Sequence, residues 1–255
     1  EIFMISTYFA FYGTAIFALP WQVSFVVAIA LTALLGVVIE RAAYRPLRDA
    51  PRISALISAI GVSFLMANLG LVIFGGRPKT FYRPPIFQAP IQLGGVRVVA
   101  LFFVIPLLTA ILLVALNYIV YKTKTGLAMR AAQWDFDTAR LMGVDVDRAI
   151  SITFAIGSAL AAVGGIMWGL RFAEINPNMG LFPGLKCFIA AVFGGIGNIS
   201  GAVLGGFILG FGEIMLVAFL PGLAGYRDAF AFIVLILILL VRPTGLLGDK
   251  QRVKV

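Results

Sequence analysis

The sequence predicts an all-α, polytopic integral membrane protein with about eight transmembrane segments. Hydrophobic residues make up 61% of the 255 positions, charged residues make up 12%, and the mean hydropathy is +1.04. Soluble domains contain about 45–50% apolar and about 25% charged residues, so this composition indicates a bilayer environment. Long apolar runs indicate membrane-crossing helices, whereas the sequence lacks the short alternating segments of a membrane barrel.

Hydropathy places eight candidate crossings along the chain, at about residues 2–19, 21–39, 53–74, 99–121, 150–170, 184–196, 201–220 and 229–241. The sixth is too short and too rich in glycine for an ordinary span, and we expect a broken or half-helix there. Such backbone is tolerated at membrane depth only where protein shields it. In transporters it often lines a substrate path.

The basic residues predict the orientation. The segments 40–52 and 122–149 and the tail from residue 242 contain 13 of the 20 Lys and Arg residues. Because the side richer in Lys and Arg is cytoplasmic, we expect 122–149 to be a cytoplasmic loop and 75–98 a periplasmic loop. All eight crossings, the short sixth included, are needed for this arrangement. The net charge of +9 comes from basic residues at the span ends, where they can contact lipid headgroups. This position explains the charge better than binding to nucleic acid does.

The loop 75–98 contains four prolines and a glycine pair near each end. This composition indicates an ordered, turn-rich or extended segment. Two interpretations stay open for it, a plain exposed loop and a contact with an external partner.

Several chemistries are excluded by the residues that the sequence lacks. The chain has no histidine and a single cysteine, Cys187, so it can form no disulfide framework, zinc site or His-based catalytic group. It has no GxxxxGK[ST] phosphate loop, so no ATP site of that type is expected. No cluster of nucleophile, base or metal ligands supports a membrane-embedded enzyme. We therefore expect a non-enzyme that holds no metal or cofactor.

Polar and small residues inside two spans are candidates for a substrate path. In the third span they recur near one helical side, where they either line a polar path or join helices by hydrogen bonds. In the sixth span they interrupt the helix and face either a pore or a neighbouring helix. From Gly201 to Gly210, glycines four residues apart favour close helix packing. The candidate path residues are Ser58, Gly61, Asn68, Gly194, Gly195, Gly197 and Asn198, together with Glu213 in a later span.

Glu213 is the acidic residue that lies deep inside a predicted span. A charge in hydrocarbon is costly, so this carboxyl group should face the bundle and either find a partner or stay protonated. No basic residue lies near it in the sequence. A structural hydrogen bond is the favoured interpretation. Proton coupling, with Glu213 on the transport path, is the alternative.

The segment 135–148 alternates apolar and charged residues between two apolar spans. Asp137 suits a helix start and lies three residues before Arg140, a spacing that favours an ion pair. Gly143 can end this helix in a left-handed turn. We expect a short cytoplasmic helix, a glycine turn and re-entry into the membrane at Ala149. A solvated loop needs no such apolar content, but a helix that inserts into a groove on another protein does.

At these residues the sequence resembles a known family, the permease subunits of branched-chain amino acid ABC importers of the LivH-like branch. The stretches that carry the resemblance are IERAAYRPLRDAPRISALISAIG (39–61), TKTGLAMRAAQWDFDTARLMGVDVDRAISITFAIG (123–157), INPNMGLFPGLKCFIAAVFGGIGNISGAVLGG (175–206), GFGEI (210–214) and VRPTGLLG (241–248). They follow one another in order over nearly the whole chain. The start of the chain falls inside the family's early spans, so we expect the family's first helix to be absent.

The resemblance implies an ABC importer permease fold, with residues 1–255 as one transmembrane permease domain and 122–149 as its cytoplasmic coupling loop. The family's coupling helix has the pattern E-A-A-x-x-x-G, which maps here onto a shortened acid, a threonine and an alanine, followed by the glycine. The residues implied to contact an ATPase are Asp137, Thr138, Ala139, Arg140, Leu141, Met142 and Gly143.

The resemblance also implies partners and a location. These are two ABC ATPase subunits that bind the ATP, a second and homologous permease that forms a heterodimer, a periplasmic substrate-binding protein and the bacterial inner membrane. The solute is expected to be a branched-chain or related aliphatic amino acid, although relatives carry other amino acids, amides or urea. The alternative function is an ion-coupled secondary transporter with Glu213 as the coupling group.

Overall fold

The computed structural model describes residues 1–48, 50–93, 96–242 and 244–248. The chain divides into two compact units, Glu1–Gly180 and Leu181–Val255, and each is described by itself. A single permease domain over residues 1–255 stays a prediction.

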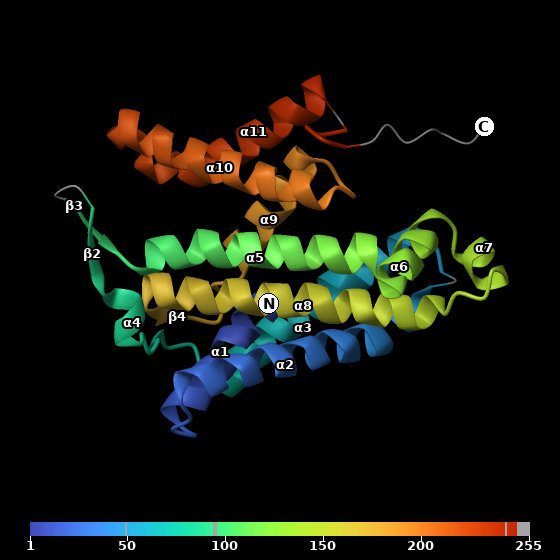
Figure 1. The fold of residues 1–255 in the computed structure, drawn as a ribbon, viewed down its shortest axis with the longest axis horizontal. Helices are drawn as coiled ribbons and strands as arrows, with labels where there is room; N and C mark the ends of the chain where they lie inside the picture. Colours follow the sequence, from blue (N-terminus) through green and yellow to red (C-terminus); the bar gives the residue numbers. More distant parts are fainter. Residues whose placement is uncertain (49, 94–95, 243, 249–255) are drawn as a thin grey trace. The chain divides into compact units, whose positions relative to one another are not determined.

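The first unit consists of α-helices with two short strand pairs at its loops (Figure 1). Its helices are α1 (Ile2–Ala15), α2 (Trp21–Ile39), α3 (Arg52–Phe74), α4 (Pro85–Gln88), α5 (Leu101–Lys122), α6 (Lys124–Trp134), α7 (Phe136–Leu141) and α8 (Val146–Phe172). A π-helical turn, η1 (Glu40–Tyr44), and a 3-10 turn, η2 (Arg45–Leu47), continue α2. Prolines precede α2 and α3, where their fixed φ suits a helix start.

The core of the first unit lies where α1, α2 and α8 pack against one another. Small residues allow this close approach. A Cβ atom on Gly165 of α8 would overlap the backbone of α1, and one on Gly36 of α2 would overlap Ser158 of α8. Glycine and serine at helix crossings are typical of packing in membranes, where close backbone approach maximises van der Waals contact. The buried apolar side chains around this crossing include Met4, Tyr8, Phe25, Ile166 and Leu170.

The second unit is built from α9 (Leu181–Gly194), α10 (Ile199–Phe219), a 3-10 turn η3 (Pro221–Tyr226) and α11 (Arg227–Val241). α9 packs against both α10 and α11. Ile189, Leu209 and Ala231 form the buried cluster where the three helices meet.

The prediction of an all-α polytopic membrane protein is confirmed, with two differences in the spans. In the described part of the chain, six helices are long and apolar enough to cross a membrane, and α1 and α9 are shorter apolar helices. α1 ends at Ala15, before residue 19. α9 is a continuous 14-residue helix, so the sixth span is short, as one of the two expectations has it, and not broken. At 1.5 Å per residue each spans about 21 Å, less than the hydrocarbon core of about 30 Å.

Loop segments gather at the two ends of the first unit. α6 and α7 lie at one end of α5 and α8, and β2 (Pro90–Leu93) with its antiparallel partner β3 (Val96–Val99) lies at the other (Figure 1). β1 (Lys79–Thr80) pairs with β4 (Glu174–Ile175). The strands in the described residues of 75–98 agree with the predicted extended segment, whereas residues 94–95 lie outside the described residues and the periplasmic placement stays a prediction. Ion pairs described below join 40–48 to 140–147, which agrees with the expected placement of both segments on one side.

Candidate functional site

The connection between α5 and α8 folds into two short helices, each of which begins at a side-chain cap. At the start of α6, Thr123 Oγ1 accepts a hydrogen bond from Gly126 N at 3.1 Å. At the start of α7, Asp135 Oδ1 accepts from the backbone N–H groups of Asp137 (3.0 Å) and Thr138 (3.2 Å). Such caps satisfy N–H groups that lack a partner inside the helix. Asp135 is therefore the cap of α7, and Asp137 lies in its first turn, as the sequence predicts.

Gly143 ends this helix in a left-handed turn, as the sequence predicts. Its φ is +80°, a region that glycine adopts without steric cost. The N–H groups of Gly143 and Val144 donate to the carbonyls of Arg140 and Ala139, both at 3.0 Å. The chain then enters α8, whose first turn is capped by the carboxylate of Asp145. Both ends of α7 are thus held in one geometry.

α7 buries one side and exposes apolar residues at its end. Ala139 is 5% exposed and packs with Ala132 of α6 and Val146 of α8. Leu141 and Met142 are 87% and 81% exposed. Because α7 lies outside the candidate membrane spans, contact with hydrocarbon does not explain these two side chains. Within Asp137–Gly143 every residue except Ala139 is exposed, so the side chains implied to meet a partner are accessible.

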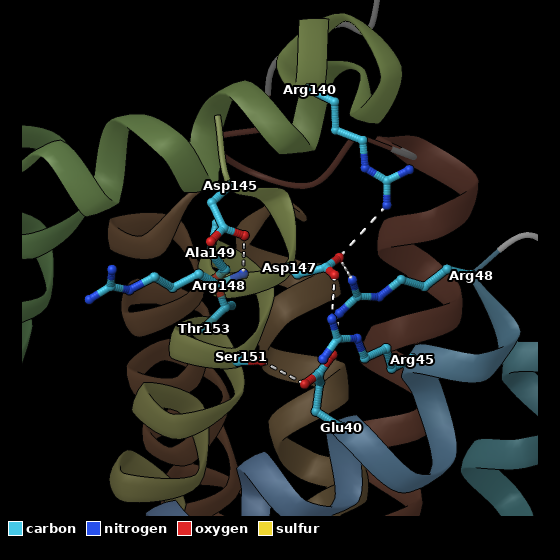
Figure 2. A network of polar contacts seen from close by, with 10 residues as sticks. All are labelled: Glu40, Arg45, Arg48, Arg140, Asp145, Asp147, Arg148, Ala149, Ser151 and Thr153. Carbon is cyan, nitrogen blue, oxygen red and sulfur yellow. Dashed lines mark hydrogen bonds and ion pairs between the residues drawn. The ribbon is translucent and has the colours of Figure 1, made fainter. Parts of the chain in front are cut away.

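Asp147, in the first turn of α8, forms ion pairs with three arginines from two other segments (Figure 2). Arg45 Nη2 lies 2.5 Å from Asp147 Oδ2, and Arg48 Nη1 pairs with Asp147 Oδ1. Arg140 Nη2 of α7 lies 3.7 Å from the same Oδ1. The expected ion pair between Asp137 and Arg140 is therefore replaced by a contact from Arg140 to α8.

Glu40 is the buried member of this network. Its side chain is fully buried at the start of η1, where it pairs with Arg48 Nη2 and accepts a hydrogen bond from Ser151 Oγ of α8 at 2.7 Å (Figure 2). Buried charges in proteins are paired and hydrogen-bonded because an isolated one is too costly. Glu40 and Arg48 therefore fix η1 and η2 to α8.

Neither Glu40 nor Asp147 is predicted as a functional residue from the sequence. The sequence signal for the pair of Glu40 and Arg48 is confined to the stretch IERAAYRPLR. There an acidic residue directly follows an apolar span, and an arginine lies eight residues later. That pattern does not reveal the partner in α8, because Asp147 lies about one hundred residues away in the chain. π-helical turns such as η1 are rare and frequently mark functional positions.

The predicted path residues of α3 do not come together around a shared polar group. Ser58 Oγ donates to the carbonyl of Ala43 at 3.3 Å, which ties α3 to η1. Asn68 Nδ2 donates to the carbonyl of Phe64 in its own helix at 2.7 Å. Gly61 faces open space. Their role in a substrate path stays a prediction.

The glycines after α9 hold the segment 244–248 against the backbone of the second unit. Leu246 N and Leu247 N donate to the carbonyls of Phe193 and Gly194, both at 2.9 Å. A Cβ atom on Gly195 would overlap the backbone at Gly248. This close approach explains why glycine is needed beside α9.

Asn198 joins the same two segments through its side chain. Its Oδ1 accepts from Gly201 N at 2.9 Å and so caps α10, and its Nδ2 donates to the carbonyl of Leu247 at 3.0 Å. Gly197 supplies another positive φ, +95°. The structure thus gives Gly194, Gly195, Gly197 and Asn198 a packing role, and a pore role for them stays a prediction. Gly201 and Gly205 approach α9 closely as expected, whereas Gly210 has open space around it.

Glu213 has charged partners in the structure, which is one of the two outcomes expected for a carboxyl group inside a span, although no basic residue lies near it in the sequence. Its buried carboxylate lies 3.0 Å from Lys186 Nζ of α9, and Arg227 Nε of α11 lies 2.7 Å from Oε2. Lys186 Nζ also lies 2.8 Å from Asp228 Oδ1. The basic partners are 27 and 14 residues away in the chain, so sequence proximity could not reveal them. The contacts join all three long helices of this unit and support the structural interpretation of Glu213.

Comparison with known proteins gives the family. Residues 1–239 match the family model described as "Branched-chain amino acid transport system / permease component". The chain is 38% identical to the high-affinity branched-chain amino acid transport system permease protein LivH of Escherichia coli K12, over the whole of this chain and 86% of that protein. It is 37% identical to the corresponding permease protein BraD of Pseudomonas aeruginosa, with the same coverage.

A more distant relative has a different named solute. The autoinducer 2 import system permease protein LsrC of Yersinia pestis is 29% identical over 72% of this chain and 53% of that protein. No solved structure matches the chain. The family model and the full-length similarity agree with the six long apolar helices and two shorter ones. The chain is therefore a multi-pass membrane protein that belongs to the branched-chain amino acid permease family.

Proposed function

We propose that this chain is one permease subunit of an ABC importer that carries branched-chain or related aliphatic amino acids across the bacterial inner membrane. In this proposal two separate ATPase subunits bind and hydrolyse ATP. A periplasmic binding protein delivers the solute, and a second, homologous permease completes the pathway. Family membership and the similarity to LivH and BraD over the whole chain support this function. The sequence itself contains no phosphate loop, which agrees with ATP binding by other subunits.

The observation that carries the proposal is the exposed apolar end of α7, a helix whose start and end are both held by hydrogen bonds. Leu141 and Met142 project from a helix that is capped by Asp135 at its start and turned at Gly143 after its end. An amphipathic helix with exposed apolar side chains at a defined position can bind in a hydrophobic groove on a partner protein. In this proposal the partner that provides the groove is an ATPase subunit.

The contacts of α7 with α6 and α8 indicate how a movement of that partner would be transmitted to the membrane-spanning helices. Ala139 packs α7 onto α6 and α8, and three residues after Leu141–Gly143 the chain enters the 27-residue helix α8. α8 runs through the core of the first unit beside α1 and α2. Packed helices move as rigid elements, so displacement of α7 acts on the bundle through α8.

The experiment is uptake by purified complexes in lipid vesicles. Vesicles with both permeases, the ATPases and the binding protein should accumulate labelled leucine, isoleucine or valine when ATP is supplied. Vesicles that lack the ATPases should not accumulate solute under an imposed proton or sodium gradient. Robust accumulation without ATPase subunits would contradict the proposal. The ion-coupled alternative gains no support from Glu213, because its carboxylate is already paired with two cations.

A further inference from the structure

Arg48 connects two carboxylates that belong to different elements. Its Nη2 pairs with Glu40, where α2 passes into η1, and its Nη1 pairs with Asp147 in the first turn of α8 (Figure 2). Asp147 is also the residue that Arg140 of α7 approaches. A continuous series of charged contacts thus leads from the exposed helix α7 through Asp147 and Arg48 to the end of α2.

The contacts become more buried along this series. The side chain of Arg140 is 50% exposed, that of Asp147 36%, that of Arg48 18% and that of Glu40 0%. Exposed ion pairs contribute little to stability and exchange readily with water. Removing one partner of a buried pair is strongly destabilising, because the other charge is left uncompensated. The outer contact can therefore open and close, whereas the pair of Glu40 and Arg48 must move together.

We propose that Arg48 is the positioning residue that makes α2 follow α7 and α8 when an ATPase subunit moves α7. This inference rests on the proposed function. The role requires a planar guanidinium, whose separate nitrogens reach two carboxylates at once in fixed geometry. A lysine ammonium is a point charge and satisfies Glu40 without the second fixed contact. Arg45 also reaches Asp147 but makes no contact with Glu40 among the described ion pairs, so it cannot replace Arg48 as the bridge.

The competing explanation is that Arg48 serves only to neutralise Glu40 and so to stabilise the fold. The two explanations differ in what a conservative substitution changes. If neutralisation is the whole role, Arg48→Lys preserves both stability and coupling. If the bridge transmits movement, Arg48→Lys preserves the assembled complex and its ATP hydrolysis but lowers the solute carried per ATP.

The test compares Arg48→Lys with Arg41→Lys in the complete transporter in vesicles. Arg41 lies in the same segment, is exposed and makes no ion pair in the part of the chain that the structure describes. Solute uptake and ATP hydrolysis are measured together. Arg48→Lys should raise the ATP hydrolysed per solute by about fivefold or more, the low end of typical coupling between sites. Arg41→Lys should leave this ratio unchanged. An unchanged ratio in Arg48→Lys, or a parallel fall of uptake and hydrolysis in an intact complex, overturns the inference.

A second variant covers the case in which Arg48→Lys fails to accumulate. Glu40→Gln combined with Arg48→Met removes both charges of the buried pair, so neither is left uncompensated. This double variant should assemble and hydrolyse ATP yet carry less solute per ATP, and normal coupling in it overturns the inference. Failure of the proposed function is distinguishable, because the unmodified complex would then show no ATP-dependent uptake.

Discussion

Glu40 and Glu213 are both buried carboxylates whose charge is neutralised by basic side chains, but their partners differ. Glu40 has one cation, Arg48, and a serine hydroxyl, whereas Glu213 has two cations. The cations of Glu213 are themselves 30% and 48% exposed, so either can turn toward solvent or headgroups if the carboxylate is lost. The carboxylate cannot do the same, because its side chain is only 4% exposed.

This asymmetry predicts the outcome of substitutions at the Glu213 cluster. Glu213→Gln should keep substantial transport and a folded complex, since the cations it releases can be solvated. Lys186→Met combined with Arg227→Gln should destabilise the protein by about 3–5 kcal/mol, because it leaves a buried carboxylate without a cation. Thermal unfolding and uptake of the purified complexes are the measurements. Loss of transport in a normally assembled Glu213→Gln complex would favour proton coupling instead.

Among the elements, α7 is the one whose proposed role depends on where the helix begins and ends. Asp135 fixes its first turn and Gly143 its last, so the helix presents Leu141 and Met142 at a defined angle. We expect a change at either end to alter the direction of the exposed residues and to leave the packing of α1, α2 and α8 intact.

Gly143→Val should therefore uncouple ATP hydrolysis from uptake. A β-branched residue at φ near +80° is strongly strained, so the turn after α7 should change its path. Gly143→Asn is the matched control, because asparagine tolerates the left-handed region far better and should retain more coupling. Hydrolysis and uptake are measured side by side in assembled complexes. Equal behaviour of the valine and asparagine variants would show that the left-handed turn does not matter.

At the scale of the whole molecule, the sequence predicted what depends on local signals. Composition and hydropathy gave the membrane class and the approximate spans, and a glycine after an amphipathic run gave the end of α7. The partners of Glu40, Asp147 and Glu213 could not be predicted, since they are brought together by packing between helices far apart in the chain. Hydropathy also extended the first span past Ala15, because it measures apolar character and not where helical hydrogen bonds stop.

The expected orientation gives a prediction for the whole chain. In a background with Cys187→Ser, Met142→Cys should react with a membrane-impermeant thiol reagent only from the cytoplasmic side. Ile86→Cys, on exposed α4 at the other end of the first unit, should react only from the periplasmic side. Both side chains are exposed, at 81% and 64%, so accessibility does not limit the reaction. Labelling of both from one side would refute the predicted topology.

The π-helical turn η1 makes the length of the segment 40–48 as important as its composition. A π turn contains one residue more than an α turn over the same stretch of axis. Deleting one residue between Arg41 and Tyr44 would turn η1 into an α turn over the same stretch of axis, so the side chains that follow would keep their direction. Inserting one residue there would instead rotate Arg45 and Arg48 by about 100° and point both away from Asp147 without any change in their identity. Helical phase at this membrane boundary is thus a constraint that alanine scanning would not detect and that a single-residue insertion would.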